Sequence, residues 1–161
     1  MKGRHLITLA WAAGVSLLAM ALRALVQAQM VLGQEIPIIP GLFSLRYVRN
    51  PGAAFGLFAA APTQFRIPFF TGVGILALIV VTFMYVREGH KSGALRFGLA
   101  MLGGGAVANL LERLLAGEVV DYLDLYVGWY HWPTFNLADI AINVGVGLLA
   151  LDAWRGRRSR R

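Results

Sequence analysis

Four long apolar stretches divide this chain, and they constrain its fold more than any other feature. They cover residues 6–22, 68–86, 97–115 and 136–154, and each is close to the roughly 20 residues that a helix needs to cross a bilayer. Only 14% of the residues are charged, against about 25% in soluble proteins. We therefore predict an all-α polytopic membrane protein with four transmembrane helices, in which residues 1–161 form a single membrane-embedded domain. For the first stretch, a cleaved signal peptide is the alternative, because a basic head precedes it.

The segments that join the first stretch to the second, and the third to the fourth, are mixed in character. Four prolines exclude one long helix from the first of them, and residues 41–48 show the loose alternation of a short strand. Residues 49–56 (RNPGAAFG) fit either a plain turn or a close backbone approach. In the second segment, Trp129 and its neighbours form an aromatic cluster suited to a membrane surface. We expect a small extracytoplasmic β-containing segment here, and Pro68 in the first turn of the second helix.

Basic residues gather on one side of the predicted membrane. The amino-terminal head, the loop at residues 87–96 and the tail at residues 155–161 hold ten of the fifteen Lys and Arg residues. By the positive-inside rule, both termini and that loop are cytoplasmic, and the two mixed segments face outward. The net charge of +7 therefore reflects multi-pass topology, and we expect no nucleic-acid partner.

Cysteine and histidine usage limits the possible chemistry. The chain has no cysteine, and its three histidines (His5, His90 and His131) lie far apart. Thiol catalysis and disulfides are therefore excluded, and no spacing suggests a metal site. We expect neither a metal nor another cofactor.

The third apolar stretch carries two faces of interest. Ala100, Gly104 and Ala108 recur every four residues, which predicts close helix packing in lipid. On the neighbouring face, Asn109 and Arg113 are also four residues apart. These two polar side chains should therefore point toward the same partner.

Asp121 and Asp139 are the candidate reacting pair. Asp121 lies just outside the third stretch and Asp139 just inside the fourth, and a carboxylate at membrane depth is costly enough to indicate function. If the chain returns one carboxylate to the other, the pair would share a proton, because two close carboxylates cannot both ionise. Such a pair could activate a water and then protonate a leaving amine. Neutral amides could hold the substrate backbone or orient the carboxylates, the candidates being Asn50, Asn109 and Asn136.

Each of these residues also has a plainer interpretation. Asp121 and Asp124 could be solvated loop charges. Asp139 could make a buried helix–helix hydrogen bond to the nearby asparagines. Arg113 could form an interfacial ion pair with Glu112. Spacing alone therefore supports a polar site at an outer membrane surface and does not define a reaction.

Three segments resemble the signatures of lipoprotein signal peptidase, the bacterial signal peptidase II family. They are IPGLFSLRYVRNPGAAFGLF (39–58), GGGAVANLLERLLAGEVVDYLDL (103–125) and FNLADIAINVG (135–145). The resemblance implies an aspartyl endopeptidase of the bacterial cytoplasmic membrane that cleaves prolipoproteins immediately before a diacylglyceryl-modified cysteine. It makes Asp121 and Asp139 the catalytic pair, surrounded by four supporting residues, Asn50, Asn109, Arg113 and Asn136. It also implies inhibition by globomycin-type peptides, and we expect a monomer in the lipid bilayer.

The chain departs from the family pattern at four positions. Ala19 stands where the family usually has an Asp, four residues before a basic residue that is Arg23 here. Ala108, Glu112 and Ile140 stand where the family usually has Gly, Asp and a small polar residue. Because both carboxylates of the pair are kept, we expect an active enzyme.

Two other classes of protein compete with this interpretation. One is a proton-coupled membrane transporter that uses Asp139, although the chain shows no internal repeat of the kind that many transporters have. The other is a non-catalytic paralogue, which would more readily have lost one carboxylate of the pair.

Overall fold

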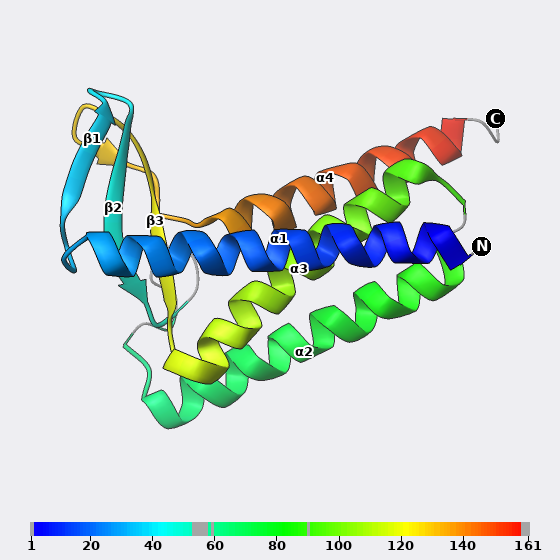
Figure 1. The fold of residues 1–161 in the computed structure, drawn as a ribbon, viewed down its shortest axis with the longest axis horizontal. Helices are drawn as coiled ribbons and strands as arrows, with labels where there is room; N and C mark the ends of the chain where they lie inside the picture. The colour runs from blue at the N-terminus through cyan, green and yellow to red at the C-terminus, as the bar shows by residue number, and fades with distance from the viewer. Residues whose placement is uncertain (1, 53–57, 59, 90, 159–161) are drawn as a thin grey trace.

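The computed structural model describes residues 2–52, 58, 60–89 and 91–158. Its four long helices each contain a window apolar enough to cross a membrane, which confirms the prediction of four transmembrane helices. They are α1 (Lys2–Gln29), α2 (Thr63–Glu88), α3 (Gly93–Ala116) and α4 (Leu137–Arg158). Both chain termini lie at one end of the bundle, and the strands lie at the other (Figure 1).

The start of α2 differs from the sequence-based prediction. The helix begins at Thr63 with Pro62 as its N-cap, so Pro68 lies inside the helix and not in its first turn. The carbonyl oxygen of Pro62 accepts hydrogen bonds from the N–H groups of Phe65 and Arg66. Our placement of Pro68 was wrong because the first helical turn is polar, and counting apolar residues does not detect it. Pro68 itself can remove only one hydrogen bond from the helix ladder.

α3 is the central helix and packs against α1, α2 and α4. Its glycines explain how closely two of these neighbours approach. A Cβ added at Gly104 would lie 2.6 Å from the carbonyl oxygen of Ala12 in α1, and one added at Gly105 would lie 2.5 Å from that of Ala138 in α4. The predicted small-residue ridge therefore does pack closely, and its neighbouring face receives α4.

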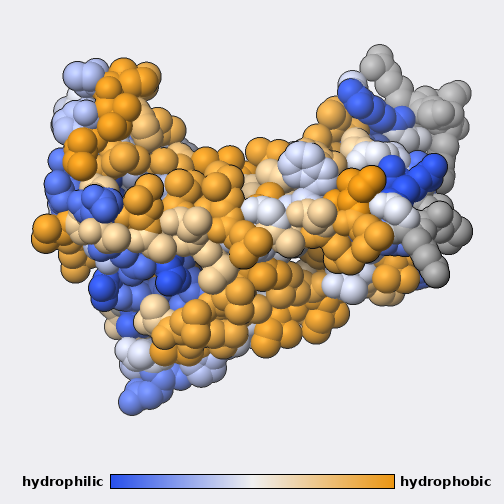
Figure 2. Space-filling view, in the orientation of Figure 1, coloured by the Kyte–Doolittle hydropathy of each residue, from blue (hydrophilic) through white to orange (hydrophobic). Residues whose placement is uncertain are grey.

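The outer surface of the bundle is apolar. No residue of α2 is buried within the protein, even though this helix is apolar enough to cross a membrane. Figure 2 shows hydrophobic residues across the middle of the molecule, with hydrophilic residues gathered toward its two ends. An exposed apolar surface of this size is stable only when lipid covers it, so the folded state depends on the bilayer.

A four-stranded antiparallel sheet closes the end of the bundle opposite the termini, and its strands follow the order β1-β2-β3-β4. The strands are β1 (Glu35–Ile39), β2 (Phe43–Asn50), β3 (Val119–Val127) and β4 (Tyr130–His131). β2 confirms the predicted strand, and its partner β3 comes from the second mixed segment. Pro37 is tolerated in β1 because this strand lies at the edge of the sheet.

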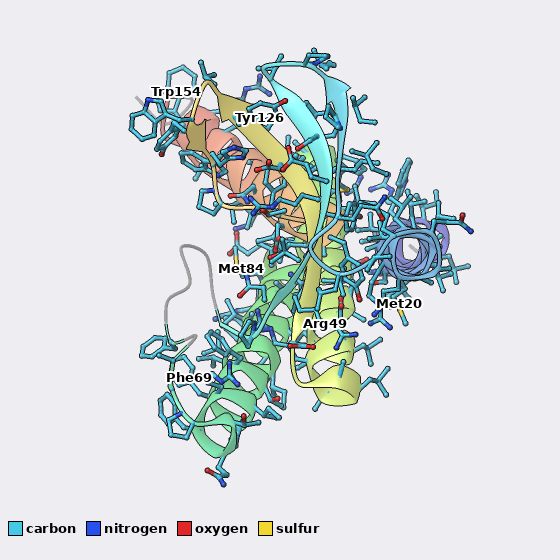
Figure 3. The ribbon with its side chains drawn as sticks, turned by 90° about the vertical axis from the view of Figure 1, so that its left-hand side faces the viewer. Met20, Arg49, Phe69, Met84, Tyr126 and Trp154 are labelled. Atoms are coloured by element: carbon cyan, nitrogen blue, oxygen red, sulfur yellow. The ribbon has the colours of Figure 1, made fainter. Side chains whose placement is uncertain are left out.

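One face of the sheet is fixed against α1. The contact is a cluster of five buried side chains, Val26, Met30, Tyr47, Val120 and Tyr122. Figure 3 looks onto the sheet end, where β2 and β3 pass between α1 on one side and α4 on the other. Successive side chains of a strand point to opposite faces. Since Val120 and Tyr122 face α1, Asp121 between them faces away from it.

Candidate active site

Asp121 lies in β3 and is held by two asparagine side chains. Its side chain is buried, with 3% of the residue exposed. Asn50, at the end of β2, donates from Nδ2 to Asp121 Oδ2 at 2.9 Å. Asn136, just before α4, donates from Nδ2 to Asp121 Oδ1 at 2.8 Å. Both carboxyl oxygens therefore have a donor, and the two donors come from different elements.

Asp139 lies in the first turn of α4 and takes part in the helix cap. Asn136 Oδ1 accepts a hydrogen bond from the backbone N–H of Asp139 at 3.1 Å. In return, Asp139 Oδ2 accepts one from the backbone N–H of Asn136 at 3.1 Å. This reciprocal pair is a capping box, with Asp in the position that Glu or Gln usually occupies. The positive end of the helix dipole also stabilises negative charge at this position.

Asparagines connect the two carboxylates. Asn109 of α3 donates from Nδ2 to Asp139 Oδ1 at 2.9 Å. Asn136 Nδ2, which binds Asp121, also lies 3.4 Å from Asn109 Oδ1. A continuous network therefore runs from Asp121 through Asn136 and Asn109 to Asp139. Asp121 and Asn136 are buried, whereas Asn109 and Asp139 are partly buried and line the adjacent cavity.

A cavity of about 630 Å³ opens beside this network. Its polar lining includes both carboxylates, together with Asn50, Asn109 and Arg113. The rest of the wall is mostly apolar and runs along the first two turns of α4, with lining residues that include Leu125, Phe135, Ile140 and Val144. Within the described residues, no group of three or more His, Cys, Asp or Glu side chains could hold a metal ion. The ionisable groups available for acid–base chemistry in this cavity are therefore two carboxylates beside a mostly apolar wall.

Arg113 also lies in this cavity, one helical turn from Asn109. It donates from Nη2 to the carbonyl oxygen of Gly52 at 2.9 Å, and its guanidinium carbon lies 4.5 Å from the centre of the Phe70 ring. Gly52 in turn donates its N–H to Asn50 Oδ1 at 3.0 Å. Arg113 therefore connects α3 to α2 and to the segment after β2. The rest of the RNPGAAFG motif, residues 53–56, lies outside the described residues, so its two interpretations stay open.

Burial raises the pKa of Asp121 from 3.8 to about 7. Removing the carboxylate from water is the largest cause, and the negative charge of Asp139 acts in the same direction. The hydrogen bonds from Asn50 and Asn136 act in the opposite direction, because they stabilise the charged form. Asp121 can therefore hold or release a proton near neutral pH.

Glu112 of α3 contacts both β3 and α1 next to the site. Its Oε1 accepts a hydrogen bond from the backbone N–H of Val120 at 2.7 Å and lies 3.6 Å from Arg23 Nη1 of α1. The ion pair that we considered between Glu112 and Arg113 is therefore replaced by a pair with Arg23. Ala19, which stands in place of a carboxylate, is buried near Arg23 and Glu112. In this chain the longer Glu112 side chain supplies the negative charge beside Arg23.

Asp124 is not the solvated loop charge that we considered. None of it is exposed, its Oδ2 accepts a hydrogen bond from Ser44 Oγ at 3.1 Å, and the same oxygen lies 2.7 Å from His131 Nδ1. The prediction failed because β3 runs through the middle of a sheet, which sequence spacing did not reveal. Ser44 and His131 gave no sequence signal of this role, because their partners are 80 and 7 residues away.

The structure thus brings all six candidate residues into one network or cavity at the sheet end of the bundle. Comparison with known proteins identifies the class. A family model described as Signal peptidase (SPase) II matches residues 11–155. A lipoprotein signal peptidase of Geobacter sulfurreducens is 44% identical over 162 residues and covers 99% of both chains. One of Syntrophus aciditrophicus is 41% identical over 152 residues and covers 94% of both.

The fold is also found among solved structures. A bacterial membrane enzyme determined by the in meso method at 2.3 Å resolution matches with a TM-score of 0.86 at 24% identity, over 96% of this chain and 92% of that one. The family match and the four membrane-length helices thus define the class as a polytopic bacterial membrane protease. The chain belongs to the signal peptidase II family.

Proposed function

We propose that this chain is an aspartyl endopeptidase that cleaves prolipoprotein signal peptides immediately before a diacylglyceryl-modified cysteine. Asp121 and Asp139 form its catalytic pair, and residues 1–161 act as one domain. The observation that carries this proposal is the network in which Asn136 hydrogen-bonds to both carboxyl groups beside one cavity. The names of the relatives supply the substrate class, lipoproteins.

The shape of the cavity suits such a substrate. Its apolar wall follows α4 past Asp139 to Ile140 and Val144, so apolar residues next to the scissile bond can occupy it. Acyl chains on the neighbouring cysteine can remain in lipid along the exposed outer surfaces of the helices. The substrate thus reaches the two carboxylates from within the membrane and does not need to leave it.

The two carboxylates have unequal surroundings, and this gives them different starting roles. Asp121 carries the proton, because burial has raised its pKa to about 7. Asp139 carries the negative charge, because the α4 N-terminus and the N–H of Asn136 stabilise it. The negative charge of Asp139 also favours the protonated form of Asp121.

The reaction then proceeds by general acid–base catalysis. Asp139 accepts a proton from a water molecule as the water oxygen attacks the scissile carbonyl carbon. Asp121 donates its proton to the carbonyl oxygen, which gives a neutral tetrahedral intermediate. Asp139 next protonates the amide nitrogen as the carbon–nitrogen bond breaks, and Asp121 recovers a proton from the intermediate's hydroxyl group. The products are a signal peptide with a free carboxyl group and a lipoprotein that begins at the modified cysteine.

The remaining polar residues hold the reacting groups and the substrate. Asn50 and Asn136 orient Asp121, and Asn109 orients Asp139. Arg113 is held by its hydrogen bond to the carbonyl oxygen of Gly52, and it lines the cavity, where it can contact the substrate. A globomycin-type peptide would inhibit by occupying the same cavity.

We further propose that the enzyme works as a monomer in the bacterial inner membrane, with both termini in the cytoplasm. The charge asymmetry of the sequence supports this orientation. It places the sheet and the catalytic pair on the outer side, where a translocated prolipoprotein presents its cleavage site.

The test is turnover of a diacylglyceryl-modified prolipoprotein by the purified protein in detergent or bilayer. Asp121→Asn and Asp139→Asn should each lower kcat by at least about 10³-fold, and the double variant should be scarcely worse than either single one. Glu118→Gln is the matched control, because this carboxylate pairs with Arg49 outside the cavity, and it should retain parental turnover. Cleavage by Asp139→Asn at a rate near that of the parent protein would refute the catalytic pair. An inactive parent protein that still binds substrate would indicate a non-catalytic paralogue.

A further inference from the structure

A second, smaller cavity lies at the opposite end of the bundle, near the chain termini. It has a volume of about 200 Å³ and lies between the first turns of α1 and α3. Its lining includes Arg4 and Arg96, together with the apolar or aromatic residues Ile7, Trp11, Phe97 and Ala100. It shares no residue with the catalytic cavity.

The charged lining of this cavity is entirely positive. Neither Arg4 nor Arg96 takes part in any ion pair of the described residues. Arg96 donates from Nη1 to the carbonyl oxygen of Gly89 at 3.3 Å, which holds its guanidinium in place and leaves other N–H groups available. Arg4 is exposed at the start of α1. Two guanidinium groups on facing helices can therefore bind one anion between them.

The nearby acidic and titratable groups are already engaged elsewhere. Asp152 of α4 accepts a hydrogen bond from Ser92 Oγ at 2.5 Å, and Glu88 of α2 pairs with Lys91. His5 lies with Nδ1 2.6 Å from the hydroxyl oxygen of Tyr85. None of these groups lines the cavity. The N-terminus of α3, which starts at Gly93 beside the cavity, adds further positive potential.

Below the arginines, the cavity becomes apolar and opens toward lipid. Trp11 and Phe97 meet edge to face, with their ring centres 5.2 Å apart. Ile7, one turn above Trp11 on the same helix, is 60% exposed. Figure 2 shows hydrophilic residues at the end of the molecule near the termini, directly beside the hydrophobic middle. From this end of the bundle toward its middle, the lining therefore changes from cationic to apolar.

We propose that this cleft binds an anionic phospholipid, with the headgroup phosphate between Arg4 and Arg96 and an acyl chain along Trp11 and Phe97. A basic pocket between transmembrane helices at the depth of the headgroups is suited to such a lipid. A lipid without net charge binds less well, because the cation of its headgroup is repelled by the two guanidinium groups. The site is independent of the catalytic pair and lies in the other leaflet.

Quenching of Trp11 fluorescence by brominated lipids tests this proposal on the full-length chain. The reporter protein keeps Trp11 as its sole tryptophan, with Trp129, Trp132 and Trp154 replaced by Phe, and circular dichroism checks that it stays helical. Brominated phosphatidylglycerol or brominated phosphatidylcholine is titrated into mixed micelles of detergent and unlabelled phosphatidylcholine. We expect half-maximal quenching at a mole fraction at least about five-fold lower for phosphatidylglycerol.

Arginine variants distinguish binding between Arg4 and Arg96 from general attraction of anionic lipid to basic residues. Arg4→Gln with Arg96→Gln should bring the two half-maximal mole fractions together. Arg87→Gln with Arg155→Gln removes the same charge from residues outside the cavity and should leave the five-fold preference intact. Equal mole fractions for the two lipids in the reporter protein would overturn the proposal, and so would equal losses in the two double variants. Inorganic phosphate added at constant ionic strength should lower the preference for phosphatidylglycerol by competing for the two guanidinium groups. Trp11 quenching that shows no lipid preference even without phosphate would mean that the site binds at most the free ion, and would refute a lipid site.

Discussion

At the scale of single residues, Asp121 shows two opposed effects on one carboxyl group. Burial favours its neutral form, whereas the amides of Asn50 and Asn136 favour its charged form. Burial is the larger effect, so the pKa rises to about 7. A raised pKa means that the folded protein binds this proton more tightly than the unfolded chain does. The stabilising contribution is therefore complete below the unfolded pKa of about 4 and is lost as the pH rises through 7.

Asp121→Asn should remove this dependence on pH. We expect the variant to be more stable than the parent protein at pH 8, by roughly 1 to 3 kcal/mol, and to lose that advantage by pH 4. Thermal or denaturant unfolding in detergent at several pH values measures the difference. Parallel stability curves for the two proteins between pH 4 and 8 would contradict the raised pKa.

A second residue-scale prediction concerns Asp124, which joins Ser44 of β2 to His131 of β4. Asp124→Ala leaves both partners without their acceptor inside the sheet, and we expect a loss of about 1 to 3 kcal/mol of stability. Asp124→Asn keeps a hydrogen-bond acceptor at this position and does not touch the catalytic pair, so its turnover should stay within a few-fold of the parent value. Unfolding and cleavage measured on both variants would decide. A loss of turnover in Asp124→Asn as large as that in Asp121→Asn would show that we chose the wrong carboxylate.

At the scale of elements, the contact between α3 and α4 sets the distance between the residues of the site. Asn109 and Asp139 form their hydrogen bond across this contact, and Gly105 lies one helical turn before Asn109. The backbone of α4 comes so close to Gly105 that a side chain of any size would push it away. Helix packing in lipid thus determines the geometry of the reacting groups directly.

Gly105→Ala should therefore reduce cleavage at least about ten-fold, because its Cβ would meet the Ala138 carbonyl oxygen at 2.5 Å and displace the start of α4. The matched control is Gly147→Ala in α4, where an added Cβ meets no atom within 4 Å. This control should keep full activity. The measurement is kcat for both variants in detergent, with the unfolding temperature as a check on folding. Equal activity in the two variants would mean that the α3–α4 spacing does not control the site.

Much of this architecture could be predicted from the sequence, for a physical reason. Hydropathy reports burial in lipid, so the four helices were evident, and helical periodicity correctly placed Asn109 and Arg113 on one face. The pairing of β2 with β3 could not be predicted from the sequence. Asn50 and Val119 pair across these strands although they are 69 residues apart, and only tertiary packing brings them together. The ion pair between Arg23 and Glu112 and the burial of Asp124 depend on that packing, and both went unpredicted.

At the scale of the whole molecule, the sheet end carries an exposed aromatic cluster. Trp129 is 91% exposed, and Tyr130 and Trp132 are each about half exposed. Such rings favour the membrane surface, so we expect them to set the depth of the sheet and of the adjacent cavity in the bilayer. The opposite end carries the basic termini. Together the two ends define how the molecule should be oriented in the bilayer.

Reporter fusions test this orientation. A reporter fused after Arg161 should be active only as a cytoplasmic protein, and one inserted near Gly128, in the turn between β3 and β4, should be active only on the outer side. A Gly128 reporter located in the cytoplasm would overturn the proposed topology. It would also separate the candidate catalytic pair from any substrate that has crossed the membrane.

The cap at the start of α4 has a consequence for how such a chain can change over time. Asn136 and Asp139 start the helix with the same atoms that we assign to positioning and catalysis. A substitution at Asp139 by a residue without a side-chain acceptor therefore removes a reactive group and weakens the start of a membrane helix in a single step. Most losses of activity at this position are then coupled to a loss of stability. An inactive descendant that kept this fold would need a residue such as Asn at position 139, or a second way to begin α4.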